Sequence, residues 1–197
     1  MNKNASDTHD LSDVEELKSQ LEAADRDARA LVADLTEELG GWRTKVGSWS
    51  VAECLDHLAS TNRVYLGAMK QSAIHAREQG RIRQGPAVPG LVGRWFVGKM
   101  EPPVKAAFRI KSPRSVEPRP APPLAHAFAS FTASQDDVRA FLSVYADLDL
   151  AAVRFPNPFV RGIRFSLATG LHVITAHERR HLWQAWRVRR AAEGAAS

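Results

Sequence analysis

Two histidines near the C-terminus have the side chains and the spacing to bind a metal ion. His177 and His181 lie four positions apart in the run His177-Glu178-Arg179-Arg180-His181. On a helix, residues four apart project from one face with Cβ atoms roughly 5–6 Å apart, so two imidazoles can share one ion. A stable site needs a third ligand, which another part of the chain must supply.

The same run matches the His-Glu-x-x-His string of zinc peptidases, in which the glutamate acts as general base. Those enzymes usually take their third ligand from downstream of the string. Beyond His181 the alanine-rich tail offers only Glu193, which lies too close to the chain end to return on a second helix. The third ligand is therefore better sought upstream.

An upstream histidine, His57, lies in an apolar helical pattern. Ser50 and Glu53 have the spacing of a capping box, which predicts a helix that starts just after Ser50 and carries His57 about two turns in. Three inward imidazoles without a metal would leave several ring nitrogens in need of partners. We therefore expect His57, His177 and His181 to converge on one divalent ion inside a helical bundle.

Both motifs resemble those of the DinB-like (YfiT-like) metalloenzyme family, and especially its DinB_2 branch. The first is Trp-Ser-x-x-Glu-x-x-x-His-Leu from Trp49, and the second is His-Glu-x-Arg-His-Leu-x-Gln from His177. The resemblance extends from about Leu11 to Val188. It implies a four-helix bundle with a three-His site, here His57, His177 and His181. Some members are thiol-dependent transferases, and many have no assigned activity.

Several side chains near the three histidines are candidates for the pocket or for supporting the ligands. Glu178 either faces the cavity edge as an acid or base, or pairs with a neighbouring arginine or another helix, and we favour the pair. Cys54 is either a thiolate ligand or a buried, inert residue, and we favour the latter. Thr61 and Tyr65 either line a pocket over the metal or pack in the core, and Gln184 either hydrogen-bonds a ligand ring or fills the core. The candidates are Cys54, Thr61, Tyr65, Glu178 and Gln184.

Apolar spacing of three and four predicts an all-α, up-down four-helix bundle. Its helices are expected at 12–39, 51–78, about 124–145 and about 165–190. Ser12 and Glu15 are predicted to cap the first helix. A long crossover at 81–122 would join the second helix to the third, with a short amphipathic helix at 90–100 and an extended segment at 104–122. The domain at 11–190 would lie between a flexible N-terminus, 1–10, and a flexible tail, 191–197.

The charge of this chain is segregated along the sequence. The net charge is +5, but residues 1–40 hold 4 Lys/Arg and 11 Asp/Glu, whereas residues 81–119 hold 9 and 2. Prolines interrupt the basic segment, which has no recognised nucleic-acid motif, so we expect a solvated surface or a rim for an anionic substrate, with Arg94 and Lys99 on that rim. A polar, acidic N-terminus, a single cysteine and the lack of a long apolar run predict a cytoplasmic protein without membrane contact.

Two functions fit these observations. The first is a metal-dependent enzyme acting on a small molecule, with zinc, nickel or iron bound by imidazoles. By resemblance, its chemistry would be transfer or hydrolysis, plausibly with a low-molecular-weight thiol. The alternative is a non-catalytic, metal- or ligand-binding dimeric bundle. Trp183 and Trp186 point away from the histidine face and predict a homodimer interface.

Overall fold

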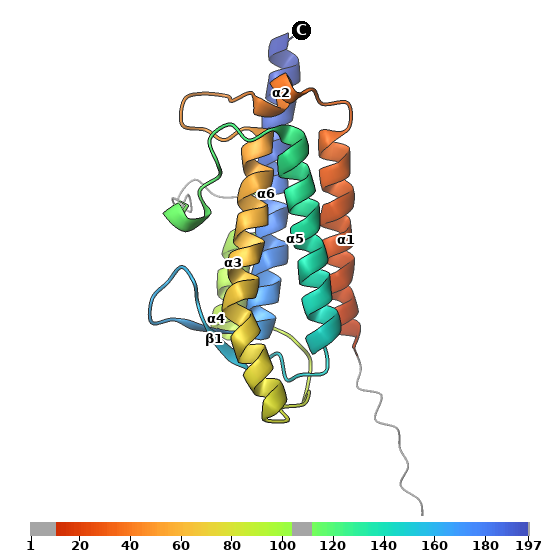
Figure 1. Cartoon of the computed structure of the whole chain (residues 1–197), viewed down its shortest axis with the longest axis vertical. Helices are drawn as coiled ribbons and strands as arrows, with labels where there is room; N and C mark the ends of the chain where they lie inside the picture. The colour runs from red at the N-terminus through yellow and green to blue at the C-terminus, as the bar shows by residue number, and fades with distance from the viewer. Residues whose placement is uncertain (1–10, 104–111, 197) are drawn as a thin grey trace, which may run out of the picture.

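Four long helices form the framework of the protein (Figure 1). The computed structural model describes residues 11–103 and 112–196. Its fold confirms the predicted all-α bundle with a long connection between the second and third main helices. The main helices are α1 (Ser12–Val32), α3 (Val51–Glu78), α5 (Leu124–Tyr145) and α6 (Leu167–Ala196).

Short elements connect the long helices. A two-stranded antiparallel hairpin precedes α6, with Phe155 opposite Phe165. The predicted amphipathic helix of the crossover is present as α4, which ends where Glu101 and two prolines follow. The short elements are α2 (Glu37–Gly41), α4 (Leu91–Met100), the 3-10 turn η2 (Arg114–Val116), β1 (Arg154–Pro156) and β2 (Arg164–Ser166).

The first helix is shorter than its apolar spacing predicted. α1 ends at Val32, and Asp34 takes a positive φ of 58°, which breaks the helix before α2. Because the chain turns there, Leu35 lies outside α1 although its spacing continues the seam. The predicted cap of α1 is also wrong: Leu11 is the N-cap residue and makes no side-chain cap hydrogen bond, while Ser12 is already helical.

The second main helix begins as its capping box predicts. The Ser50 side chain accepts a hydrogen bond from the Glu53 amide, and the Glu53 carboxylate accepts one from the Ser50 amide. Satisfying these amides locally fixes the first residue of α3. This start sets the rotational position of every later residue of α3, including His57.

The crossover determines the direction of the third main helix. Hydrogen bonds join Arg63 to Ser130 and Arg77 to Val144, with the same separation of 67 positions in both pairs, so α3 and α5 run in parallel. Two parallel neighbours require a connection as long as the bundle, because the chain must return to the end where α3 began (Figure 1). Up-down alternation is therefore interrupted between α3 and α5.

Two parts of the predicted domain plan concern the chain ends and the crossover. α6 continues to Ala196, so residues 191–196, set apart above as a flexible tail, belong to this helix. The predicted flexible N-terminus, 1–10, and residues 104–111 of the predicted extended segment lie outside the described residues. Within 11–103 and 112–196, none of the helices has the length and apolar character that crossing a bilayer requires.

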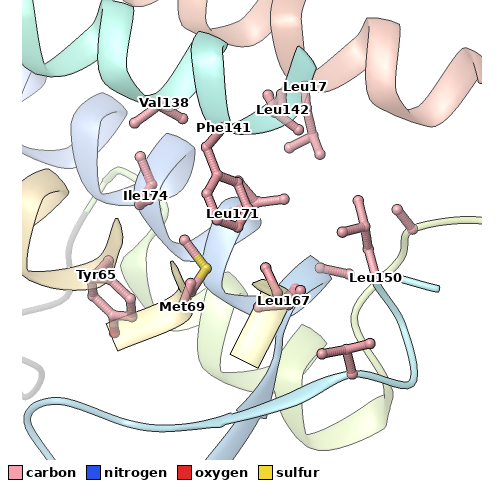
Figure 2. Packing of buried hydrophobic residues seen from close by; sticks show 14 of the residues in the cluster. Leu17, Tyr65, Met69, Val138, Phe141, Leu142, Leu150, Leu167, Leu171 and Ile174 are labelled. Atoms are coloured by element: carbon pink, nitrogen blue, oxygen red, sulfur yellow. The ribbon is translucent and has the colours of Figure 1, made fainter. Parts of the chain in front are cut away.

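The hydrophobic core consists of two clusters stacked along the bundle. One lies beside the hairpin and includes Met69, Phe155 and Leu171 (Figure 2). The other lies towards the α2 end and includes Leu55, Phe131 and Leu182. Buried polar side chains lie between these clusters along α3, α5 and α6, among them Asn62, Gln135 and Glu178. His177 and His181 lie at the same level of α6, whereas His57 lies on the turns of α3 that belong to the second cluster.

Candidate metal centre

The three predicted ligands come together from two antiparallel helices. His57 lies two turns into α3, and His177 and His181 lie one turn apart on α6. The Nε2 atoms of His57 and His177 are 3.2 Å apart, and the ligand atoms of all three side chains lie within 4.8 Å of one another. Two nitrogens bound at 2.0–2.1 Å to a tetrahedral zinc would be about 3.3 Å apart, so this spacing fits a shared ion.

The environment keeps all three imidazoles neutral. Burial lowers the pKa of His57, His177 and His181, and the last two fall well below the ordinary value of 6.5. His57 also lowers the pKa of His177, both of these rings lower the pKa of His181, and the positive charge of Arg180 acts on all three in the same direction. A neutral imidazole has the lone pair that a metal requires, so the cluster is in its ligand form at neutral pH.

The outer nitrogen of His57 determines which tautomer that ring adopts. His57 Nδ1 lies 2.6 Å from the backbone carbonyl of Val116, in η2 of the crossover. A carbonyl can only accept, so Nδ1 carries the hydrogen and Nε2 presents its lone pair to the other two rings. The Nδ1 atoms of His177 and His181, by contrast, are buried and have no hydrogen-bond partner among the described residues.

Trp49 covers one side of the cluster. Its ring centroid lies 4.6 Å from that of His57 and 5.5 Å from that of His181. Among the described histidines, cysteines and acids, the group close enough to share one ion consists of His57, His177 and His181. Three neutral nitrogen donors with an apolar wall fit a divalent ion of the zinc type, and they leave coordination positions that these side chains do not fill.

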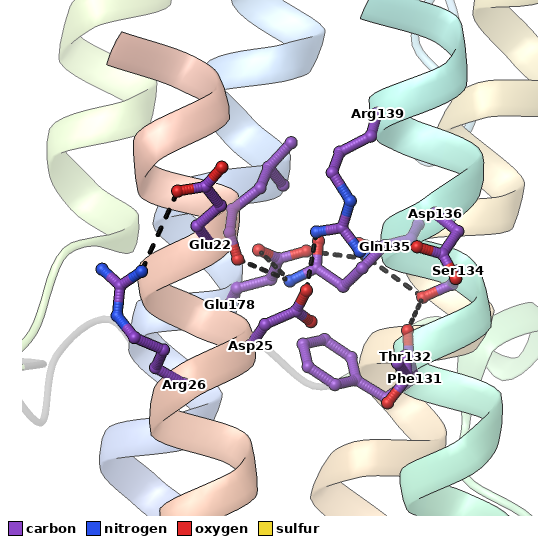
Figure 3. A network of polar contacts seen from close by, with 12 residues as sticks. Glu22, Asp25, Arg26, Phe131, Thr132, Ser134, Gln135, Asp136, Arg139 and Glu178 are labelled. Atoms are coloured by element: carbon purple, nitrogen blue, oxygen red, sulfur yellow. Dashed lines mark hydrogen bonds and ion pairs between the residues drawn. The ribbon is translucent and has the colours of Figure 1, made fainter. Parts of the chain in front are cut away.

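Glu178, next to His177, is fully buried and lies in a polar network with Gln135 between the helices (Figure 3). Its carboxylate accepts hydrogen bonds from Asn62 at 2.8 Å and from Gln135 at 3.3 Å. Burial raises its pKa to about 8, although these two hydrogen bonds oppose the shift. Glu178 therefore links α6 to α3 and α5, and it does not occupy the position of a peptidase general base.

The other α3 candidates have different surroundings. Cys54 is fully buried among apolar side chains, and burial raises the pKa of its thiol so far that it stays protonated. Tyr65 packs edge-on against Phe155 and Phe159 beside the hairpin, within the apolar cluster of Figure 2. Thr61 lies one turn from His57, and its buried hydroxyl has no partner among the described residues.

Arg180 is the cation that acts on the histidine cluster, whereas Arg94 and Lys99 were the predicted rim residues. Arg94 and Lys99 are on α4, which packs on α6 where Gly93 meets Thr169, two turns before His177. Lys99 extends over the ring of Trp95. Arg180, partly buried between the two α6 ligands in sequence, lowers the pKa of all three rings.

Gln184 and His172 lie on either side of the ligand pair along α6. Gln184 raises the pKa of His181 through a side-chain hydrogen bond, which favours the protonated ring. His172 turns its Nε2 towards the Ala87 carbonyl at 3.2 Å, outside the cluster.

A family comparison agrees with this geometry. The family model of the DinB superfamily, DinB_2, matches residues 20–185. The chain belongs to the DinB superfamily. DinB superfamily proteins generally bind metal, and the three-His cluster can hold a divalent ion in this member. Neither a curated protein nor a solved structure matches the chain.

Proposed function

We propose that this DinB superfamily protein is a divalent-metal-dependent enzyme that acts on a small molecule by group transfer or hydrolysis. The convergence of three neutral imidazole nitrogens carries the proposal. When bound, a zinc, nickel or iron ion would supply Lewis-acid activation of the small molecule. The chain itself contributes three fixed lone pairs, the apolar shield of Trp49 and the nearby charge of Arg180.

A low-molecular-weight thiol is our preferred co-substrate. Glu178 faces the core, and Cys54 stays a buried thiol, so neither acts as an acid, base or nucleophile at the cluster. An external thiol would provide the nucleophile that these side chains do not. The positive charge of Arg180 favours a thiol or acceptor that carries a carboxylate.

Small-molecule partners also suit the basic part of the chain better than nucleic acid. Arg83 pairs with Asp13, and Arg119 pairs with Asp56, so cations of this segment take part in intramolecular ion pairs. Titration with duplex and single-stranded DNA at two salt concentrations tests this point. Tight binding with a steep salt dependence would contradict it, because phosphate contacts release counterions.

A non-catalytic, dimeric binding protein is the second candidate. The features that favour it are the core-facing Glu178 and a surface groove lined by Trp183 and Trp186 beside α1. Trp186 is tied to its own subunit by a 2.7 Å hydrogen bond to Asp27, and the Arg189 guanidinium lies 5.5 Å from the centre of its ring. Sedimentation of wild-type protein and of the double variant Trp183→Ala/Arg190→Ala tests dimerisation through this groove.

The decisive experiment is elemental analysis of protein purified without an affinity tag, followed by a screen of thiols and electrophiles with and without chelator. We expect about one equivalent of metal and a chelator-sensitive transfer or hydrolysis. Single alanine variants of His57, His177 and His181 should lose both. His172→Ala is the matched control, because it removes another α6 imidazole outside the cluster. Unchanged metal content in the three cluster variants would refute the site, and metal without activity would favour the binding protein.

A further inference from the structure

One crossover residue, Val116, is in contact with a proposed metal ligand through its backbone. Its carbonyl lies 2.6 Å from Nδ1 of His57, and the residue is almost fully buried at 1% exposure. The segment that carries it is otherwise irregular, with a single 3-10 turn between prolines. Regular secondary structure therefore does not hold the carbonyl in place.

An ion pair with a buried carboxylate holds the chain three residues further on. Oδ2 of Asp56 accepts a hydrogen bond from the backbone amide of Arg119 at 2.8 Å, and Oδ1 accepts one from Nε at 2.9 Å and a short contact from Nη2 of the same guanidinium. Burial alone would raise the pKa of Asp56, but the bonds from Arg119 outweigh it and hold that pKa below its usual value. Asp56 is thus a charged anchor for the crossover at neutral pH.

The anchor and the ligand are adjacent in sequence. Asp56 and His57 are consecutive residues of α3, and together they contact Arg119 and Val116 of one short segment. Both contacts are made to the same short segment of the crossover. A shift of Arg119 would therefore be transmitted over three residues to the Val116 carbonyl. His57 is also the one ligand of the three whose outer nitrogen has a partner among the described residues.

We propose that the Asp56–Arg119 pair is a positioning element of the metal centre, which holds the Val116 carbonyl on His57 and so fixes this ligand's tautomer and ring orientation. The inference rests on the proposed metal site. Outer groups that orient a histidine ligand commonly change metal affinity about 10- to 100-fold when they are removed. Neither Asp56 nor Arg119 is a catalytic residue in this account, since both act through His57.

A second pair on the same helix provides a matched control. Arg43 makes a bidentate contact with Glu53, at 2.9 and 2.5 Å, one turn before Asp56. The exposures are similar, with arginine side chains at 42% and 53% and carboxylates at 6% and 4%. The Glu53 pair braces the connection before α3, whereas the Asp56 pair braces the segment that touches His57.

The experiment compares Arg119→Met with Arg43→Met in the full chain. Zinc affinity is measured by competition with a chromophoric chelator, and the His57 tautomer by nitrogen-15 NMR of the metal-free protein. We expect Arg119→Met to bind zinc about 10- to 100-fold more weakly and to lose the pure Nδ1–H form of His57. Arg43→Met should keep wild-type affinity and tautomer, even where its thermal stability falls. Arg119→Lys should recover part of the affinity.

The outcomes separate this inference from the proposed function. Wild-type affinity and an unchanged tautomer in Arg119→Met would overturn the positioning role, as would equal losses in both methionine variants. If wild-type protein bound none of zinc, nickel and iron, the proposed function would fail, and the tautomer of the metal-free protein would still decide whether Arg119 positions His57. Asp56→Asn, which keeps side-chain shape, provides a second variant with the same expected direction.

Discussion

His177 and Glu178 are neighbours on α6, yet they belong to two differently built polar regions. His177 joins a cluster in which two ring nitrogens are buried without a partner among the described residues. Glu178 faces the opposite region, in which Asn62 and Gln135 donate to its carboxylate (Figure 3). Burial shifts both groups towards their neutral forms, because charge is costly away from water.

The two regions differ in whether their buried polar groups have hydrogen-bond partners within the protein. Glu178 is satisfied by amides of the protein itself, so its region links three helices. The cluster leaves lone pairs directed at a common point, which suits a ligand that is not part of the chain. Burial of polar groups is tolerated in both regions, but it produces a structural link in one and a binding site in the other.

The largest effect that separates the two regions should come from metal. Zinc at about 1,000 times its dissociation constant should stabilise the wild-type fold by about 4 kcal/mol, because binding to the folded state adds directly to the free energy of unfolding. His177→Ala should lose this gain, whereas Glu178→Gln should keep it. Urea unfolding with zinc and with chelator measures the gain. Equal stabilisation of His177→Ala and wild type would contradict the assignment of the cluster.

Truncating the core-facing group should cost stability without any metal. Glu178→Leu removes the acceptor that the buried amides of Asn62 and Gln135 share and leaves each with its longer hydrogen bond, to Ser134 Oγ and the Leu21 carbonyl, which should lower the free energy of unfolding by roughly 2–4 kcal/mol. Glu22→Leu, at an exposed position of α1, is the control and should change the free energy of unfolding by less than about 0.5 kcal/mol. The comparison is made by urea unfolding of metal-free protein. A Glu178→Leu variant as stable as the control would refute the linking role.

The pH dependence of Glu178 sharpens the same comparison. Its pKa is about 8 in the folded protein and 4.5 as an ordinary carboxyl group, so folding keeps a proton that the unfolded chain releases. The contribution of this group to stability is complete below about pH 4.5 and is lost as pH rises to about 8. Glu178→Gln lacks this pH dependence. The free energy of unfolding of the metal-free variant should therefore rise by about 2 kcal/mol relative to wild type between pH 6 and 8. A constant difference between the two unfolding curves would show that Glu178 is ionised in the fold.

The smallest expected effect concerns the charge beside the cluster. Arg180 lowers the pKa of all three histidines, so Arg180→Gln should raise those pKa values. Protons would then compete with metal at a higher pH. NMR titration of the imidazoles measures the shift, and Arg187→Gln, which removes a cation stacked on Trp183, is the control. Histidine pKa values equal to those of wild type would place the Arg180 charge outside the site.

The sequence predicted much of the fold because helix geometry is local. The box at Ser50 and Glu53 correctly predicted where α3 begins, and the three-four spacing correctly predicted 124–145 as a helix. The same spacing failed at α1, where it continues through Leu35 although the chain turns at Asp34. Apolar periodicity reports which face is buried, and a short second helix can prolong that pattern after a turn.

The proximity of the three histidines was also predictable, whereas their surroundings were not. Residue type, position on a helix and the family resemblance together selected His57, His177 and His181, and the structure brings these three side chains together. The direction of Glu178 into the core depended on how α3 and α5 pack against α6. Gln135 gave a partial signal as the polar residue on an apolar seam, but its partner lies 43 positions away.

By itself, the sequence determined most of the helices, the face that each one buries and the pairing of His177 with His181 on one face, because these follow from the 3.6-residue repeat and from local caps. Only the tertiary structure decided that α3 and α5 run in parallel, that Glu178 is satisfied by amides and that Val116 accepts from His57. A backbone carbonyl has no side-chain signature, and its position depends on an ion pair between Asp56 and Arg119, 63 positions apart. Contacts of this kind exist only after the chain has folded.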